Sequence, residues 1–399
     1  MSWHEGERAT VIAGVILAAV ALVAYIGIVH AAWNFATLTT PDQRPLAPDF
    51  ANFWSAAKLA RSGKAAAAYD LDRLYQVEEQ VFGTHSRYGS GWYYPPTFLL
   101  AVLPLGWLPY VPALLIWLTV TMALYSLVWS RLCTHPILIP LFFLFPAMFH
   151  NFLIGQNGFL TGALLGGGLM ILDGWPLAGG CLFGLMTYKP QLVILVFPAL
   201  LLARRWKALS AAVATSLLLI LISVAVFGYQ LWFTYFQAMA LPMREVAMGS
   251  APWRIMPTFF VAVRAAGGGV TAAYLVQGLV MLAVAAGVAW VWRQPAAPLA
   301  SRGTVLILGV LLFTPYEFDY DLVILALALG WLWEEGRRRG RLPGELLLLL
   351  AGWLLPAAAP ILYTWINLLH RHLQIGPVIL AALFLLSLSR ARTSGIRGQ

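Results

Sequence analysis

A few ionisable and amide side chains stand beside long apolar runs, where charge is costly and usually serves a site. They are Asp49, Lys189, Arg254, Glu317, Asp319 and Asp321, together with the amides Gln156 and Asn157 and the phenol Tyr94. A carboxylate can take a proton from an attacking hydroxyl, and a cation can hold the charge that develops on a departing phosphate. Amides and further carboxylates can bind sugar hydroxyls. Together these residue types suit the transfer of a sugar from a phosphate carrier to a hydroxyl.

Each residue has a place in such a scheme. Asp49 is the candidate general base, and Lys189 and Arg254 are candidates for binding the donor phosphate. The candidates for contacting the sugar or the acceptor are Tyr94, Gln156, Asn157, Glu317, Asp319 and Asp321. Other aromatic residues could stack on sugar rings, although they are also typical of a membrane interface. These others are Trp54, Trp92, Tyr93 and Trp253.

Structural roles compete with these chemical ones. Asp49 follows Pro48 and could be a helix N-cap, and Asp319 and Asp321 could cap the helix after them. Lys189 could extend to the lipid headgroups, and Gln156-Asn157 could simply form a turn. His370 and His372 fit a solvated interfacial pair better than a metal site. What favours a site is that the candidates fall in connections on the same side of the chain's apolar segments.

Composition places these residues in a membrane protein. Of the 399 residues, 61% are hydrophobic and 10% are charged, whereas about 25% are charged in an ordinary soluble domain. Mean hydropathy is +0.78. One soluble core could not bury so much apolar surface. The net charge of +9 comes mostly from Lys and Arg that flank apolar runs, so it requires no nucleic-acid partner. With only two cysteines, neither a disulfide framework nor a cysteine-based metal site is available.

The elements that must position the candidates are apolar helices and one long polar segment. An uncleaved first helix is predicted at about 9–33, followed by a polar outer loop at about 34–96. Within this loop an amphipathic surface helix is predicted over 50–60 and a second short helix over 71–81. Eleven further apolar segments follow. They lie near 98–130, 136–150, 157–172, 175–188, 190–204, 208–228, 271–292, 303–315, 320–333, 343–363 and 376–389.

Several of these segments are shorter than the roughly 20 residues that a straight span needs, so tilted or broken helices are expected. The prediction is an all-α polytopic bundle of about 10–13 transmembrane helices, forming one domain over residues 1–399. With the N-terminus in the cytoplasm, fourteen Lys and Arg fall at cytoplasmic ends and five at outer ends. Six more lie in the long loop, which completes the 25 of the chain. This bias favours cytoplasmic N- and C-termini and places the candidate site at the outer face.

Short motifs along the chain resemble those of glycosyltransferase family 87, the polyprenyl-phosphate-mannose-dependent alpha-mannosyltransferases. The resemblance spans roughly residues 45 to 325, and the order and spacing of its motifs are its main support. The motifs are Pro48-Asp-Phe-x-x-Phe-Trp-x-Ala57, Tyr94-Pro-Pro96, Gly155-Gln-Asn-Gly158, Gly179-Gly180 through Lys189-Pro190, and Pro315-Tyr-x-x-x-Tyr-Asp-Leu322.

The resemblance implies a C-type glycosyltransferase fold with its active site facing the periplasm or the exterior. It also implies an inverting transfer from a polyprenyl-phosphate sugar, without a divalent metal or other cofactor, in which Asp49 is the base. The partners would be that donor, a glycolipid or glycan acceptor and the lipids of the plasma (inner) membrane. Mycobacterial members carry histidine in the late outer segment, where this chain has Glu317-Phe-Asp-Tyr-Asp321. The rival interpretation is a transporter or flippase, but no internal repeat supports it.

Overall fold

The structure is a computed structural model that describes residues 23, 38–39, 44–83, 91–295, 297–368 and 373–396. Within these residues the chain is helical, with one isolated bridge between Thr39 and Pro45 and no β-strand. The prediction of an all-α fold is therefore confirmed. The predicted first helix, apart from Val23, and the pair His370 and His372 lie outside the described residues.

The chain forms α-helices of very different length, joined by short 3₁₀ turns. The α-helices are α2 (Pro48–Arg61), α3 (Leu71–Phe82), α4 (Pro96–Val102), α5 (Tyr110–Leu132), α6 (Leu138–Phe143), α7 (Pro146–Ile154), α8 (Gly158–Ile171), α9 (Pro176–Leu185), α10 (Pro190–Val193), α11 (Val196–Leu202), α12 (Trp206–Phe227), α13 (Gln230–Ala238), α14 (Ala240–Met248), α15 (Phe259–Ala265), α16 (Val270–Trp292), α17 (Leu299–Leu312), α18 (Leu325–Arg339), α19 (Glu345–Leu368) and α20 (Gly376–Ile396). The 3₁₀ turns are η1 (Ala65–Tyr69), η2 (Leu103–Trp107), η3 (Met186–Tyr188), η4 (Trp253–Ile255) and η5 (Asp321–Ile324).

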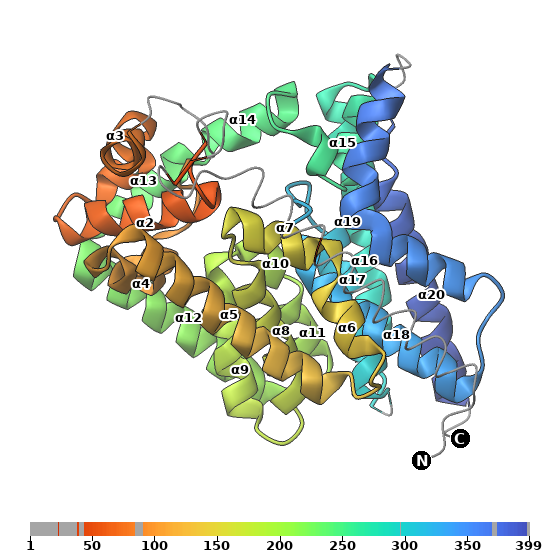
Figure 1. The fold of residues 1–399 in the computed structure, drawn as a ribbon. Helices are drawn as coiled ribbons and strands as arrows, with labels where there is room; N and C mark the ends of the chain where they lie inside the picture. The colour runs from red at the N-terminus through yellow and green to blue at the C-terminus, as the bar shows by residue number, and fades with distance from the viewer. Residues whose placement is uncertain are drawn as a thin grey trace.

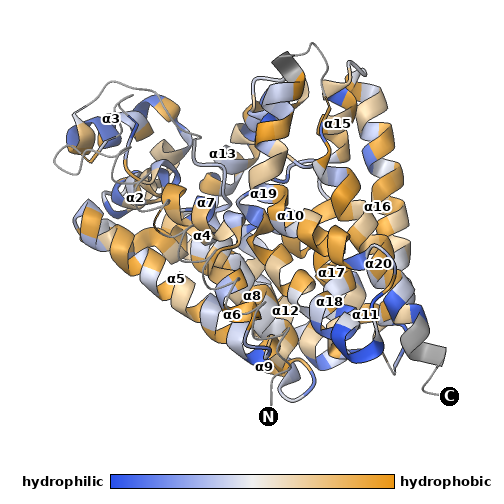
Figure 2. Cartoon of the chain, turned by 45° about the vertical axis from the view of Figure 1, so that its right-hand side comes forward, coloured by the Kyte–Doolittle hydropathy of each residue, from blue (hydrophilic) through white to orange (hydrophobic). Residues whose placement is uncertain are grey.

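Apolar helices with exposed apolar faces make this a membrane protein. Among the described residues, four helices are long and apolar enough to span a bilayer, in α5, α12, α16 and α19, and five shorter apolar helices accompany them. Leu221 of α12 is 65% exposed and Leu279 of α16 is 68% exposed. Figure 2 shows the apolar colouring that continues along these helices. Lipid would cover these surfaces, since water would not favour them.

Prolines explain why several predicted segments appear as pieces. The segment expected over 98–130 is divided into α4, η2 and α5, with Pro104 and Pro109 at the breaks. The segment expected over 136–150 is divided at Pro146 into α6 and α7. Proline lacks the N–H that a continuing helix needs, and it disfavours helical geometry in the residue before it. The broken helices predicted from the short segments are therefore present.

Small residues bring neighbouring helices close together. A Cβ atom at Gly180 of α9 would lie 2.1 Å from the carbonyl oxygen of Ala208 in α12, and one at Gly184 would lie 2.6 Å from that of Ala212. Such close backbone approach is how helices pack within membranes. One large buried core includes residues of α2 and α3, of the bundle and of α20.

The polar segment at about 34–96, predicted as an outer loop, differs from its prediction in how deeply it is buried. α2 was expected to lie on the membrane surface, but most of its residues are buried, including the polar Asn52 and Ser55. The reason is its small side chains: a Cβ atom at Gly106 of η2 would lie 2.8 Å from the Ala57 carbonyl oxygen. α3 is amphipathic as predicted, and buries Leu74, Glu78 and Phe82 at four-residue intervals.

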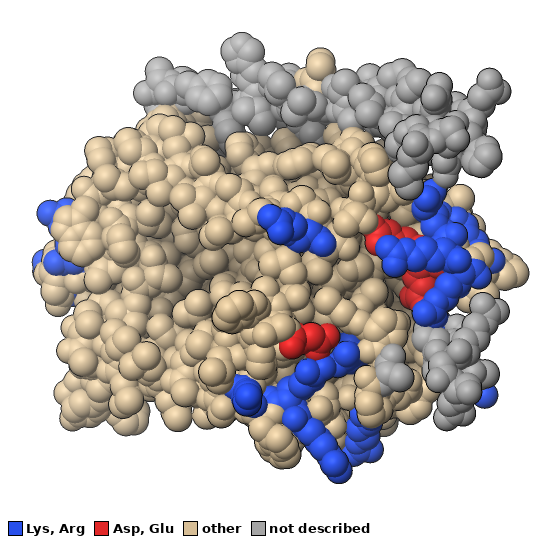
Figure 3. Space-filling view, turned by 90° about the horizontal axis from the view of Figure 1, so that it is seen from below, with Lys and Arg blue, Asp and Glu red and all other residues tan. Residues whose placement is uncertain are grey.

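Residues 229–269, for which the sequence predicted no helix, form α13, α14, η4 and α15. α13 packs against η1 and α4, and Figure 1 shows α2, α3 and α13–α15 at one end of the bundle, at the top of that view. Figure 3 shows the opposite end, where Lys and Arg outnumber Asp and Glu. The polar site described next lies toward the first of these ends.

Candidate active site

Asp49 is held at the start of α2 by the turn that precedes it. Ala47 is the N-cap in a left-handed conformation (φ 53°, ψ 67°), Pro48 follows, and no side chain caps the helix. The interpretation of Asp49 as an N-cap is therefore wrong. The Tyr110 hydroxyl contacts the carbonyl oxygens of Leu46 and Ala47, at 3.2 Å from the latter. Asp49 is half-buried in the first helical turn, where the helix dipole favours a negative charge.

The turn at 155–158 packs closely because its two glycines lack side chains, and Gly155 places it against the start of α2. Gly155 ends α7 with φ +70°, and a Cβ atom there would lie 2.5 Å from the Phe50 Cβ. A Cβ atom at Gly158 would lie 2.5 Å from Asn151 Oδ1, which accepts a hydrogen bond from the Gly158 N–H at 2.8 Å. Trp117 donates from Nε1 to the Gly155 carbonyl at 3.1 Å. The turn is therefore fixed against α2, α5 and α7.

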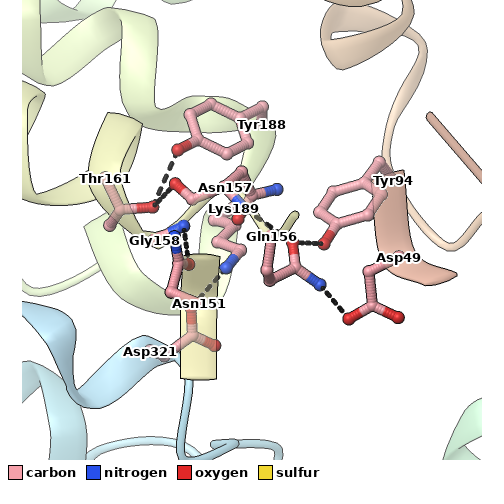
Figure 4. Close-up of polar contacts among 10 residues, drawn as sticks. All are labelled: Asp49, Tyr94, Asn151, Gln156, Asn157, Gly158, Thr161, Tyr188, Lys189 and Asp321. Carbon is pink, nitrogen blue, oxygen red and sulfur yellow. Dashed lines mark hydrogen bonds and ion pairs between the residues drawn. The ribbon is translucent and has the colours of Figure 1, made fainter. Parts of the chain in front are cut away.

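The Gln156 side chain connects this turn to Asp49. Its Oε1 accepts from the Tyr94 hydroxyl and from the Asn157 N–H, each at 2.9 Å. Its Nε2 donates to Asp49 Oδ2 at 2.9 Å. Figure 4 shows the amide between Tyr94 and Asp49. Because two donors meet the oxygen, the NH₂ group must face the carboxylate, and this settles the amide orientation. Gln156-Asn157 thus forms a turn and also binds the candidate base.

Tyr94 stands in an aromatic cluster that fixes its ring. Its ring centroid lies 4.7 Å from that of Phe98 and 5.3 Å from that of Trp92. Burial, and after it the charges of Asp321 and Asp49, hold the pKa of Tyr94 well above its usual value. It therefore remains a phenol that can donate to Gln156. Trp54 and Trp92 are buried in this packing, which is unlike an exposed platform for a sugar ring.

A buried ion pair forms a second part of the site. The Lys189 ammonium contacts Asp321 Oδ1, and both residues are 2% exposed. Lys189 therefore does not extend to the headgroups, and η5 has no side-chain cap from Asp321. Glu317 is fully buried, and neither of its carboxyl oxygens has a hydrogen-bond partner within the described part of the chain. A buried polar group without a partner is costly, so Glu317 is a side chain that a ligand would satisfy, as is Asn157, whose amide atoms also lack partners among the described residues.

Asp319 lies near Arg254 because its backbone binds Ile255, the residue that follows Arg254 in η4. The Asp319 N–H donates to the Ile255 carbonyl at 2.8 Å, and Asp319 and Arg254 line one small cavity beside α19. His150 Nδ1 lies 3.0 Å from Asp319 Oδ1. The charges of Asp319, Asp49 and Arg254 all act on the His150 imidazole. Arg254 itself is exposed.

Glu78 of α3 is a second carboxyl near the candidate base. It is 5% exposed, and its Oε1 has no hydrogen-bond partner in the described residues. Burial, followed by the charge of Asp49, raises the pKa of Glu78 to about 8. Its apolar neighbours along the helix face, Leu74 and Phe82, explain the burial. Glu78 is therefore largely protonated at neutral pH.

The nine predicted residues fall into three neighbouring groups. The groups are Asp49, Gln156, Asn157 and Tyr94; Lys189, Asp321 and Glu317; and Asp319 with Arg254. Sequence reasoning missed His150 and Glu78. His150 stands at the end of a predicted apolar segment, five residues before Gly155, which is a signal that could have found it. Within the described residues, no three His, Cys, Asp or Glu side chains are grouped to hold a metal ion.

Comparison with known proteins bears on this geometry. The model of glycosyltransferase family 87 matches residues 92–315, more than half of the chain. Tyr94, Gln156, Asn157, Lys189 and Arg254 lie within the match, Asp49 precedes it, and the three late carboxylates follow it. No curated protein and no solved structure matches the chain. The helical membrane architecture agrees with the family match. The chain belongs to glycosyltransferase family 87 and is a membrane glycosyltransferase.

Proposed function

We propose that the protein transfers a hexosyl group, specifically mannosyl, from a polyprenyl phosphate to an acceptor hydroxyl with inversion at the anomeric carbon. The observation that carries the proposal is the 2.9 Å contact between Gln156 Nε2 and Asp49 Oδ2. It joins a half-buried carboxylate to a turn inside the matched family region.

In the proposed reaction Asp49 is the general base. The acceptor hydroxyl loses its proton to Asp49 while its oxygen forms a bond to the anomeric carbon. The bond between that carbon and the phosphate oxygen breaks, and its electron pair leaves with the polyprenyl phosphate. Attack and departure occur on opposite faces of the ring, which gives inversion. The donor is a co-substrate, and the proposal requires no metal or other cofactor.

The departing phosphate needs positive charge near it. Arg254 is the first candidate because it is exposed and stands beside Asp319. Lys189 is the second. Its ammonium is buried against Asp321, so its charge would act through the poorly screening interior unless that pair opens. His150 adds a third group that can carry positive charge in the same region.

The remaining candidates are proposed as contacts to the sugar or the acceptor. Glu317 supports this role because its buried carboxyl has no hydrogen-bond partner among the described residues, and a sugar hydroxyl would provide one. Asn157, Asp319 and Asp321 surround the same region. Tyr94 is proposed to hold Gln156 in addition to lining the site.

The protein is proposed to lie in the plasma (inner) membrane, as the resemblance to the family implies, and the distribution of Lys and Arg supports cytoplasmic termini. The site would then face the periplasm or the exterior. The partners would be the polyprenyl-phosphate sugar, a glycolipid or glycan acceptor and the surrounding lipids. Lipid-linked substrates fit a site that lies beside membrane-embedded helices.

A transfer assay tests the proposal. Purified protein is given radiolabelled polyprenyl-phosphate mannose and a membrane lipid extract, with Asp49→Asn in parallel. The expected result is a labelled product with the wild type and a loss of about 10²–10⁴-fold in rate with Asp49→Asn. Asp49→Asn keeps the side-chain volume, and its thermal unfolding would show whether the fold is intact. Undiminished transfer by folded Asp49→Asn would disprove the proposed base.

A further inference from the structure

A basic hollow lies at the end of the bundle opposite Asp49, between the α11–α12 and the α16–α17 connections. It has a volume of about 710 Å³ and is lined by four arginines, Arg204, Arg205, Arg293 and Arg302. Figure 3 shows the face where basic side chains outnumber acidic ones. The charge bias along the chain assigns this end to the cytoplasm.

The positive charge of this hollow is only partly balanced. Asp173 contacts Arg205 and lies 3.8 Å from Arg302. For Arg204 and Arg293 no acidic partner is found among the described residues. One acidic side chain therefore stands against four arginines.

A second basic group, near the end of α18, is balanced differently. Arg338 lies 3.4 Å from Glu334, and Arg339 lies 3.1 Å from Glu335. Arg390 of α20 contacts the buried Glu345. The positive-inside rule accounts for arginines in both groups. It does not account for a hollow in which four arginines share one acidic partner, Asp173.

The backbone at Arg204 allows a substitution that removes one charge from the hollow without straining the fold. Arg204 has φ +55°, a left-handed conformation that glycine adopts with far less strain. It ends α11 in a tight turn, with N–H bonds from Arg204 to Leu201 and from Arg205 to Leu200. Glycine would relieve this strain, so Arg204→Gly removes the arginine side chain while favouring the same helix end.

The walls of the hollow indicate an amphipathic ligand. Leu201 and Trp206 line it and are 46% and 59% exposed. Trp206 begins α12, whose apolar residues face outward along most of its length. Trp292 closes the hollow from inside and donates from Nε1 to the Arg302 carbonyl at 3.1 Å. A ligand with a phosphate for the arginines and hydrocarbon for these side chains matches both surfaces.

We propose that this hollow binds the phosphate headgroup of an anionic lipid from the cytoplasmic leaflet. Basic pockets between membrane helices at this depth suit such headgroups. The bound lipid would bridge the α11–α12 and α16–α17 connections. The proposal does not depend on the sugar transfer or on Asp49.

Lipid binding to the purified, delipidated full chain tests this. Phosphatidylglycerol, phosphatidylcholine and inorganic phosphate are each titrated, and binding is followed by thermal unfolding and by native mass spectrometry. Wild type is expected to bind phosphatidylglycerol most tightly. Arg204→Gly and Arg293→Ala are each expected to weaken that binding about fivefold, as the loss of one arginine near an anionic headgroup implies. Arg338→Ala, which removes one charge from the balanced group, is the matched control and should bind like wild type.

Arg204→Gly separates binding from folding, because it relieves the strained backbone and should leave the lipid-free protein at least as stable. Equal weakening by Arg338→Ala would overturn the proposal, since binding would then follow surface charge alone. Equal binding of phosphatidylcholine would overturn it as well. If inorganic phosphate alone gave the full effect, and Arg204→Gly abolished it, the phosphate site would stand and its assignment to lipid would be wrong.

Discussion

Gln156 and Asp49 are joined by a hydrogen bond whose direction is set by the opposite end of the Gln156 amide. Because Tyr94 and the Asn157 N–H both donate to Oε1, Nε2 is left to face the carboxylate. The orientation of the Gln156 amide, and with it this contact to the candidate base, therefore depends on Tyr94 and on the Asn157 N–H.

This dependence predicts graded losses of transfer activity. A hydrogen bond to a charged group contributes about 1.5–3 kcal/mol, so Gln156→Ala should lower kcat by about 10- to 100-fold. Tyr94→Phe removes only the neutral bond that orients the amide, and should cost less than Gln156→Ala. Steady-state kinetics with the lipid-linked donor would measure both. A positioning role requires that KM for the donor change much less than kcat. Equal losses in the two variants would contradict the proposed order of contacts.

Gly155 is predicted to be intolerant of any side chain. Its φ of +70° is strained for alanine, and a Cβ atom would lie 2.5 Å from the Phe50 Cβ. Gly155→Ala should therefore destabilise the protein by at least about 1–3 kcal/mol and displace the start of α2, with loss of transfer. Gly174→Ala is the matched control, because a Cβ atom there would have no neighbour within 4 Å. Thermal unfolding in detergent compares the two, and similar melting temperatures would refute the prediction.

The buried pair of Lys189 and Asp321 predicts strongly non-additive stability effects. Lys189→Met leaves a buried carboxylate without its partner and should cost about 3–5 kcal/mol. The double variant Lys189→Met/Asp321→Leu should recover most of that loss. Arg338→Met provides a surface comparison, since Arg338 is 75% exposed at its pair with Glu334 and such pairs contribute about 0–1 kcal/mol. Additive effects of the two buried substitutions, measured by denaturation, would show that the pair is not coupled.

Glu78 predicts a pH dependence of the protein's stability. Its pKa is raised to about 8 in the folded protein, against an ordinary value near 4.5. A carboxyl whose pKa is raised by folding stabilises the protein fully at low pH, and that contribution is lost as pH rises through the folded pKa. Wild type should therefore lose a few kcal/mol of stability between about pH 5 and pH 9.

Glu78→Gln, which stays neutral, should show a flatter profile over the same range. It should match wild type near pH 5 and exceed it near pH 9. Melting temperatures of both proteins across this range provide the measurement. Parallel profiles for the two proteins would show that Glu78 does not titrate in that window.

Most of the fold could be predicted from apolar segments, because burial in lipid requires long apolar helices regardless of tertiary detail. α8, α12 and α16 lie within two residues of their predicted bounds. The breaks at Pro104 and Pro109 were harder to place, since proline marks where a helix can end and packing decides whether it does. α2 was expected at the surface because its bulky residues share one face, but small residues on its other faces allow the chain to cover it.

The candidate residues were found from the sequence, but their contacts were not. Charged residues beside apolar segments stand out, so Asp49, Lys189 and Asp321 could be named. The pairing of Lys189 with Asp321 joins positions 132 residues apart, and no local pattern encodes it. Glu78 was missed because a glutamate on an amphipathic helix is ordinarily solvated, and only the tertiary packing buries it.

Asp49 lies before the residues that match the family, whereas Gln156 and Tyr94 lie within them. The short contact surface of α2 with Gly155 and Tyr110 is therefore a natural boundary for chimeras. The first outer segment of another membrane glycosyltransferase could be exchanged there, provided that it presents a carboxylate to Gln156 and a small residue to Gly155. Such exchanges would show whether the segment that carries Asp49 can be replaced while the part of the chain that matches the family is kept.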